Sequence, residues 1–149
     1  MSDVLQILSD LSSIDVEHLA ELSLIENESV MADLNAEQMA RGLRPDNSEI
    51  TPTYSDLTIE LKQGRPGLSG ITDRVTLYET GEHYKKLYAE IKGSEYEMGS
   101  KDLKSEKLQK KYGKIYGLSD DSKETLVSGP LYKSWKENVE KLTPFKLTK

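Results

Sequence analysis

Two short runs in which apolar and polar residues alternate constrain the fold of this chain more than any other feature. They cover residues 87–91 (LYAEI) and 95–98 (EYEM), and Lys92-Gly93-Ser94 lies between them. Two such runs joined by a short turn that contains glycine are typical of a β-hairpin with one face in contact with water. The sequence therefore predicts an antiparallel pair of strands near the middle of the chain.

The residues that precede the hairpin predict a strand, a turn and a short helix. Val75 and Leu77 are apolar and two positions apart, which is the spacing of side chains on one face of a strand. Thr80 and Gly81 follow as a turn, in which Gly81 can supply an unusual backbone angle. Thr80 is also the expected N-cap of a helical segment over residues 82–87.

The residues that follow the hairpin predict another helix and a return of the chain to the core. Ser100 or Asp102 is the expected N-cap of a helix that runs from about residue 103 to Tyr112. Gly113 ends this helix, because glycine adopts a left-handed C-cap conformation at the lowest cost. Three residues then return apolar side chains to the core: Ile115, Tyr116 and Leu118.

The first 44 residues are predicted to form a helical arm. The apolar residues of segment 4–11 have helical spacing, and Asp15 is the expected N-cap of a second helix. This second helix extends to about Gly42, where the chain can turn, and Asn27 and Ser29 are residues at which the helix can break. The arm either packs on its own domain or docks on a neighbouring subunit.

Further elements are predicted on both sides of the central stretch. Ser55 is the expected N-cap of the helix that follows it, and residues 64–70, with three glycines and one proline, are typical of an exposed loop. The pair Ser119-Asp120 is the expected cap of the last helical region, which residues 128–130 (Ser-Gly-Pro) interrupt. Trp135 lies on an apolar stripe of this region, where an anchor in the core is its expected role.

The composition is that of a globular protein with one domain. The chain has 149 residues, enough for one hydrophobic core, and 36% of them are apolar. No run approaches the roughly 18 apolar residues of a transmembrane helix. The sequence contains no cysteine, which excludes a disulfide bond and a thiolate metal site. We expect a soluble protein that is intracellular where it is made.

Charge is distributed unevenly along the chain. Residues 1–50 carry eleven acidic residues and two arginines, a balance of −9, whereas residues 101–149 carry seven acidic residues and twelve lysines, a balance of +5. Ends of opposite charge can pair head to tail between subunits, or they can form two faces that water solvates separately.

No arrangement of residues typical of catalysis occurs in the sequence. His18 and His83 each lack a second histidine at metal-binding spacing, so both are expected at the surface or at an interface. Glu95 and Glu97 share one face of a strand, for which solvation is the ordinary explanation. The glycine-rich loop over residues 64–70 lacks the lysine of a phosphate-binding loop. We therefore expect no enzyme activity, no metal, no cofactor and no small-molecule substrate.

The order of the central segments resembles that of one protein family. The segments are VTLYETGEHYKKLY (75–88), the hairpin and KLQKKYGKIYGLS (107–119), and upstream segments 33–42 and 50–55 are similar to the start of the same family. This family comprises small virion proteins of Bacteroides-infecting tailed phages, including crAss-like phages, and the order more distantly resembles tail-completion and head-to-tail connector proteins. The residues of the family motif, which we expect at interfaces, are Leu77, Thr80, Gly81, Tyr84, Tyr112, Gly113, Gly117 and Leu118.

The resemblance implies both a fold and a role. The implied fold is α+β, with a helical N-terminal arm (residues 1–44) and a connector-like domain (residues 45–149) in which helices pack on a small antiparallel sheet, as one globular unit overall. The implied role is that of a structural virion protein, copies of which form a ring in the neck between portal and tail. Its partners would be itself, the portal and other neck or tail proteins, while DNA only passes through the channel and no membrane is contacted. Assembly would take place in the host cytoplasm.

Two alternatives to the ring remain open. The first is a phage nucleic-acid-binding or regulatory protein that uses the lysine-rich C-terminal half. The lysines of residues 101–114 are interleaved with Asp102 and Glu106, however, and the whole chain has a net charge of −6, which disfavours binding to free DNA. The second alternative is a protein packaged inside the virion.

Overall fold

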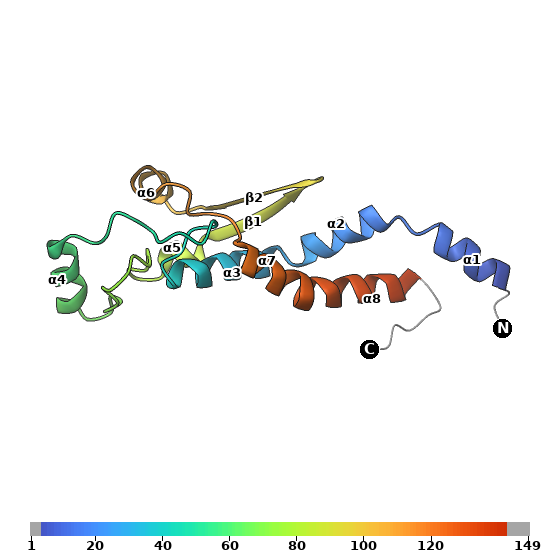
Figure 1. Ribbon diagram of the computed structural model, residues 1–149, viewed down its shortest axis with the longest axis horizontal. Coiled ribbons are helices and arrows are strands. Elements are labelled where there is room, and N and C mark those ends of the chain that lie inside the picture. The colour runs from blue at the N-terminus through green and yellow to red at the C-terminus, as the bar shows by residue number, and fades with distance from the viewer. Residues whose placement is uncertain (1–3, 143–149) are drawn as a thin grey trace.

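The computed structural model describes residues 4–142, which form an elongated α+β structure (Figure 1). The elements are, in order, α1 (Val4–Ser12), α2 (Val16–Glu26), α3 (Glu28–Ala40), α4 (Asp56–Gly64), α5 (Glu82–Lys85), β1 (Leu87–Lys92), β2 (Glu95–Ser100), α6 (Ser105–Tyr112), α7 (Asp120–Leu126), the π-helical turn η1 (Val127–Leu131) and α8 (Tyr132–Leu142). Helix α1 lies at one end of the molecule and α4 at the other. The predicted fold class is confirmed, whereas the likeness to connector proteins and the boundary at residue 44 stay predictions.

The second part of the predicted arm consists of two helices. Asp15 caps α2 as predicted, because its carboxylate accepts a hydrogen bond from a backbone N–H in the first turn at 3.0 Å. Asn27 separates α2 from α3, and its side-chain amide donates to the carbonyl of Ser23 and to the hydroxyl of Ser134 in α8. The positive φ of Gly42 turns the chain just after α3, at the predicted place.

The predicted hairpin is confirmed. Strands β1 and β2 pair in antiparallel register from Leu87 opposite Ser100 to Lys92 opposite Glu95, which leaves a two-residue turn that contains Gly93. Helix α3 packs against β1, and α2 also contacts this strand. The sheet therefore has one side covered by the helices of the arm.

Two clusters of buried side chains form the interior. The first contains Met39, Ile50, Val75, Leu77, Tyr112, Ile115 and Tyr116. The second contains Met31, Leu34, Ala89, Leu118 and Leu126. Met98 of β2 packs against both clusters, so the hairpin joins them. The predicted return of the chain to the core after α6 is confirmed by the burial of Ile115, Tyr116 and Leu118.

The strand predicted at Val75 and Leu77 does not form. Leu77 has a φ of 56°, in the left-handed region that a residue with a branched apolar side chain rarely adopts. The hydroxyl of Tyr54 accepts hydrogen bonds from the backbone N–H groups of Thr76 and Leu77 at 3.0 and 3.2 Å. A side chain thus takes the place of a neighbouring strand, and the alternation of Val75 and Leu77 indicates burial without strand pairing.

The short helix before the hairpin begins differently from the prediction. Helix α5 covers only Glu82–Lys85, and its N-cap is Gly81 with a φ of 87°, so the prediction of Thr80 as N-cap was wrong. A Cβ atom at Gly81 would lie 2.8 Å from the hydroxyl oxygen of Tyr78, so the tyrosine ring can approach only because position 81 has no side chain. Glycine therefore fits this position on account of both backbone angle and space.

Helix α6 is shorter than predicted, although its end is correct. It begins at Ser105, and its N-cap residue, Lys104, makes no capping hydrogen bond through its side chain. Asp102 lies three residues before the first residue of α6, and its carboxylate accepts a hydrogen bond from the backbone N–H of Lys104 at 3.3 Å. Gly113 ends the helix with a φ of 75°, as predicted.

The C-terminal helices form one continuous rod. Ser119 caps α7 as predicted, but residues 128–130 do not interrupt the helix, because the wider π-helical turn η1 accommodates Pro130, which has no N–H to donate. Trp135 of α8 is half-buried and stacks on Tyr132, with 6.4 Å between ring centroids, so it is more exposed than the expected core anchor. The predicted helix end at residues 144–145 lies outside the described residues.

Candidate functional site

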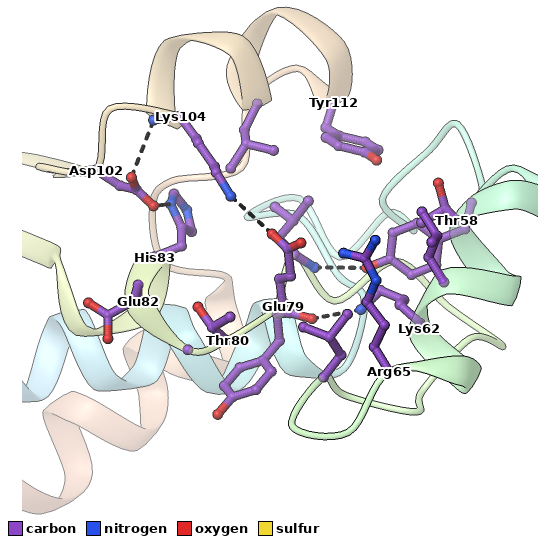
Figure 2. A pocket seen from close by; sticks show the side chains of 17 residues that line it. Thr58, Lys62, Arg65, Glu79, Thr80, Glu82, His83, Asp102, Lys104 and Tyr112 are labelled. Carbon is purple, nitrogen blue, oxygen red and sulfur yellow. Dashed lines mark hydrogen bonds and ion pairs between the residues drawn. The ribbon is translucent and has the colours of Figure 1, made fainter.

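A pocket of about 290 Å³ lies between α4 and the segment that contains α5 and α6 (Figure 2). Apolar side chains, among them Leu77, Leu108 and Tyr112, form part of its wall. Charged side chains from three separate parts of the chain complete the wall: Lys62, Arg65, Glu79, Glu82, Asp102 and Lys104. The fold therefore gathers both cations and anions around one hollow.

Lys62 is the most buried of the cations around this pocket. Only 7% of its surface is exposed, and its ammonium group donates a hydrogen bond to the carbonyl oxygen of Tyr78 at 2.7 Å. The same ammonium lies 5.0 Å from the centre of the Tyr54 ring, a distance that suits a cation–π contact. Among residues 4–142, no carboxylate lies within ion-pair distance of Lys62, whereas Lys104 pairs with Glu79 at 3.0 Å.

His83 lies in a buried polar network next to the pocket, so the prediction of a surface or interface position was wrong. Its Nδ1 atom is 3.4 Å from the Asp102 carboxylate, and its Nε2 atom is 3.2 Å from the hydroxyl of Tyr116. The Tyr116 hydroxyl is also 2.8 Å from the hydroxyl of Ser105. With the proton on Nδ1, the imidazole can donate toward Asp102 and accept from Tyr116. Both ring nitrogens thus face protein groups, and the network fixes α5 to α6.

Burial determines the charge state of this network. Burial lowers the pKa of His83 below its ordinary value of 6.5 and outweighs the opposing effect of Asp102, so the imidazole is neutral at pH 7. Burial acts to raise the pKa of Asp102, but its hydrogen bond from Lys104 and the nearby Lys86 and His83 lower it overall. Burial also raises the pKa of Tyr116. The network therefore holds one carboxylate beside neutral partners.

The structure brings four of the eight motif residues to this pocket. Leu77, Thr80, Gly81 and Tyr112 all line it. Tyr84 lies close by in the interior, where its hydroxyl donates to the carbonyl of Thr76, its ring stands edge-on to Tyr78 at 5.1 Å between centroids, and burial raises its pKa.

The other three motif residues lie elsewhere. Gly113 ends α6, while Gly117 and Leu118 line a separate surface hollow of about 490 Å³. Gly117 has a φ of 133°, and a Cβ atom there would lie 3.1 Å from the ring of Pro45, so the close approach of these two loops requires glycine. The eight motif residues therefore do not form a single surface.

The charged residues of the pocket were not predicted as a site from the sequence. Lys62 and Arg65 occupy the end of a helix and a loop, where lysine and arginine are usually solvated. The one available signal is the glycine-rich segment at residues 64–70, which was predicted to be an exposed loop. It contains Arg65 and begins two residues after Lys62. Lys62 and Arg65 meet Glu79 and Lys104 only because α4 packs against segments far away in the sequence.

A second surface of interest is the exposed apolar face of α1. Val4, Leu8 and Leu11 are 67%, 56% and 46% exposed, and none of the residues of α1 is buried. In Figure 1 this helix continues outward from α2, away from η1 and the start of α8. The molecule therefore displays an amphipathic helix whose apolar side contacts little of the described chain.

The third feature is an apolar groove of about 200 Å³ between α2 and the η1–α8 rod. Its lining residues are Ala20, Ser23, Leu24, Val127, Leu131, Tyr132 and Trp135. Val127 is 57% exposed and Tyr132 is 49% exposed, so the groove opens to the surface. Its walls can accept apolar side chains but offer few polar groups to orient a polar ligand.

No protein-family model, curated protein or solved structure matches this chain. Within residues 4–142, no helix combines the length and the apolar character needed to cross a membrane. The same residues contain no group of three or more histidine, aspartate or glutamate side chains placed to hold a metal ion. Hypotheses about function therefore depend on the geometry of the pocket, the groove and α1, together with the family resemblance of the central segments.

Proposed function

We propose that this protein is a structural component of a tailed-phage virion and that it assembles with copies of itself through α1. The observation that carries the proposal is the exposed apolar face of this helix, formed by Val4, Leu8 and Leu11. The order of the central segments, which resembles that of small neck and tail-completion proteins, supports a ring between portal and tail as the place of assembly.

Helix α1 needs a partner to be stable. It has nine residues, fewer than the roughly 12–15 that an isolated helix needs in water, and none of its side chains is buried. Most of the stability of a short helix comes from packing of its apolar face. A helix with this pattern gains that packing when it lies in an apolar groove of another chain.

The groove between α2 and the η1–α8 rod of a neighbouring copy is the proposed binding place for α1. Its lining is mostly apolar, and its volume of about 200 Å³ suits one or two aliphatic side chains such as Leu8 and Leu11. The linker from α1 to α2 has only three residues, and α1 points away from the groove of its own chain. A second copy therefore offers the more direct contact.

This contact joins two different surfaces, which is the kind of interface that produces rings. A helix of one copy in the groove of the next is a heterologous interaction, and such interactions close into a ring when the rotation between copies permits it. The balance of −9 in residues 1–50 and +5 in residues 101–149 supports the same head-to-tail order, because the acidic arm approaches the basic half of its neighbour.

Light scattering coupled to size-exclusion chromatography tests the assembly. The full chain is expected to form oligomers in a concentration-dependent manner. Leu8→Glu places a charge in the apolar interface and is expected to weaken association at least about tenfold, and Val127→Glu in the groove is expected to do the same. Ser9→Glu and Ser128→Glu are the matched controls, because they add the same charge at neighbouring exposed positions outside the two apolar surfaces.

Two outcomes contradict the assembly. One is a chain that stays monomeric at every concentration and is not retained by a portal. The other is equal weakening by the control variants and by Leu8→Glu, which shows that net charge and not the apolar contact governs association. Immunogold labelling of purified particles tests the location, and particles without label at the neck contradict a place there.

A second candidate function is nucleic-acid binding by lysines exposed on α6 and just after it. Lys107, Lys111 and Lys114 are exposed and, among the described residues, have no carboxylate within ion-pair distance, whereas Lys110 pairs with Glu106. Gel shifts at several salt concentrations distinguish the two functions. A nucleic-acid-binding protein loses affinity steeply with salt, and a ring component with a net charge of −6 is expected to bind free duplex weakly at any salt concentration.

A further inference from the structure

We propose that the pocket between α4 and α6 binds a small organic anion, a carboxylate or a phosphate group attached to an apolar or aromatic body. The partners implied by the family resemblance include no small molecule, so this site adds a function to the proposed one and does not depend on assembly. The proposal rests on the charges, the walls and the size of the pocket.

The first argument is that two of the three cations of the pocket wall have no carboxylate partner among the described residues. Glu79 pairs with Lys104, Glu82 pairs with Lys85 at 2.9 Å, and Asp102 lies 4.0 Å from the ammonium of Lys86. Each of the three carboxylates of the pocket wall therefore has a cation close to it. Two other cations of the pocket, Lys62 and Arg65, have no carboxylate within ion-pair distance among the described residues.

The second argument is the burial of Lys62. Lys62 as a residue is 7% exposed, and the groups found beside its ammonium are the Tyr78 carbonyl, which accepts a hydrogen bond, and the Tyr54 ring. Burial of a charged group is costly unless an opposite charge and hydrogen bonds compensate for it. An ammonium can donate three hydrogen bonds, and residues 4–142 provide one acceptor for that of Lys62. An anion in the pocket would accept one of the remaining hydrogen bonds and supply the missing opposite charge.

The third argument is the position of Arg65. Its side chain extends from the end of α4 toward the same hollow as Lys62, as Figure 2 shows. A guanidinium and an ammonium on one side of a pocket can bind a carboxylate or a phosphate together, the guanidinium through two parallel hydrogen bonds. This arrangement selects an anionic group over a neutral one.

The fourth argument concerns the rest of the ligand. Leu61, Leu77, Leu108 and Tyr112 offer apolar surface to a ligand whose charged group lies at Lys62 and Arg65. The volume of about 290 Å³ is near the lower end of the range for ligand pockets, roughly 300–1,000 Å³. The expected ligand is therefore small, with one anionic group and a compact apolar part.

Nuclear magnetic resonance titration of the full chain with phenyl phosphate tests the site, with inorganic phosphate and phenol as separate probes. Phenyl phosphate is expected to cause saturable shifts in residues 77–82 and to bind at least about tenfold more tightly than either of the other two probes. Lys62→Met is expected to weaken binding at least about tenfold, and Arg65→Gln several-fold. Lys110→Gln is the matched control, since this lysine lies on the outer surface of α6 in an exposed pair with Glu106.

Three results would overturn the proposal. The first is the absence of saturable binding of phenyl phosphate to the wild-type chain. The second is equal weakening by Lys110→Gln and Arg65→Gln, which indicates nonspecific attraction to lysines. The third is wild-type affinity in Arg65→Gln. This result alone decides the matter if Lys62→Met does not fold, because the exposed side chain of Arg65 makes no hydrogen bond or ion pair among the described residues.

Discussion

Helices α1 and α3 belong to the same predicted arm, yet they differ in almost every physical respect. Helix α1 has apolar residues at regular helical spacing and buries none of them. Helix α3 has a mixed sequence, and its buried residues include two amides, Asn35 and Gln38, beside the methionines Met31 and Met39. The helix with the clearer amphipathic pattern is thus the more exposed one.

The difference teaches that an amphipathic pattern specifies a face for burial but not the surface that covers it. Helix α3 is covered by β1 and by the loop after α6, to which its polar side chains are matched. Asn35 donates to the carbonyl of Ile115 at 3.2 Å, and Gln38 accepts from the backbone N–H of Ser119 at 2.8 Å. These hydrogen bonds offset the cost of burying the two amides, although Asn35 Oδ1 is buried without a hydrogen-bond partner among the described residues. In residues 4–142, α1 meets no comparable surface.

The substitution Met39→Ala is expected to show the largest effect. Met39 is fully buried in the first cluster, so the change leaves a cavity and lowers the free energy of unfolding by about 3 kcal/mol. Denaturant-induced unfolding followed by circular dichroism measures the change. If the free energy of unfolding falls by less than about 1 kcal/mol, α3 is not tightly packed and does not differ from α1 in this respect.

The substitution Gln38→Ala tests the polar contacts of the same helix. Loss of the side chain leaves the backbone N–H of Ser119 and the carbonyl of Gly117 without their partner in the interior. The free energy of unfolding is expected to fall by about 2 kcal/mol. The same denaturation measurement decides the result. If Gln38→Ala is neutral, the match between α3 and the loop after α6 contributes little to stability.

Acid is expected to weaken the interior network around His83. The folded state holds His83 neutral, and the unfolded chain binds a proton near the ordinary pKa of 6.5. The stability that the folded state gains from neutral His83 is therefore complete above about pH 6.5, and it is lost as pH falls toward the lower pKa of the folded state. Unfolding curves between about pH 7 and pH 5 measure this slope, which His83→Gln should flatten. An unchanged slope in that variant contradicts the role of His83.

The substitution Leu8→Ala is expected to show the smallest effect on the monomer. Leu8 is 56% exposed, so its truncation should change the free energy of unfolding of the dilute chain by less than about 0.5 kcal/mol. Association at high concentration should nevertheless weaken, which separates the role of α1 from that of α3. If Leu8→Ala destabilises the dilute chain as strongly as Met39→Ala, α1 packs on its own domain and the comparison fails.

Elements with local causes were predicted well from the sequence. The caps at Asp15 and Ser119 and the helix end at Gly113 depend on side chains and backbone angles within a few residues. The hairpin depends on alternation around a glycine turn, which is also a local pattern. These elements account for the confirmed α+β fold class.

Elements that depend on distant groups were not predicted. The strand at Val75 and Leu77 is absent because the Tyr54 hydroxyl, 22 and 23 residues before the two N–H groups it binds, replaces a strand partner. His83 is buried because Asp102 and Tyr116 meet it across a fold that sequence spacing does not reveal. The pocket at Lys62 and Lys104 likewise combines segments far apart in the chain, and its charged residues belong to no motif.

The sequence by itself determined the caps at Asp15 and Ser119, the hairpin turn and the uneven charge, because these follow from hydrogen bonds and side-chain spacing over a few residues. Only the tertiary structure decided which faces are buried, which cations lack a carboxylate partner, and where the apolar face of α1 is left exposed. Burial is a relation between surfaces, and the partner of each surface comes from packing over the whole chain.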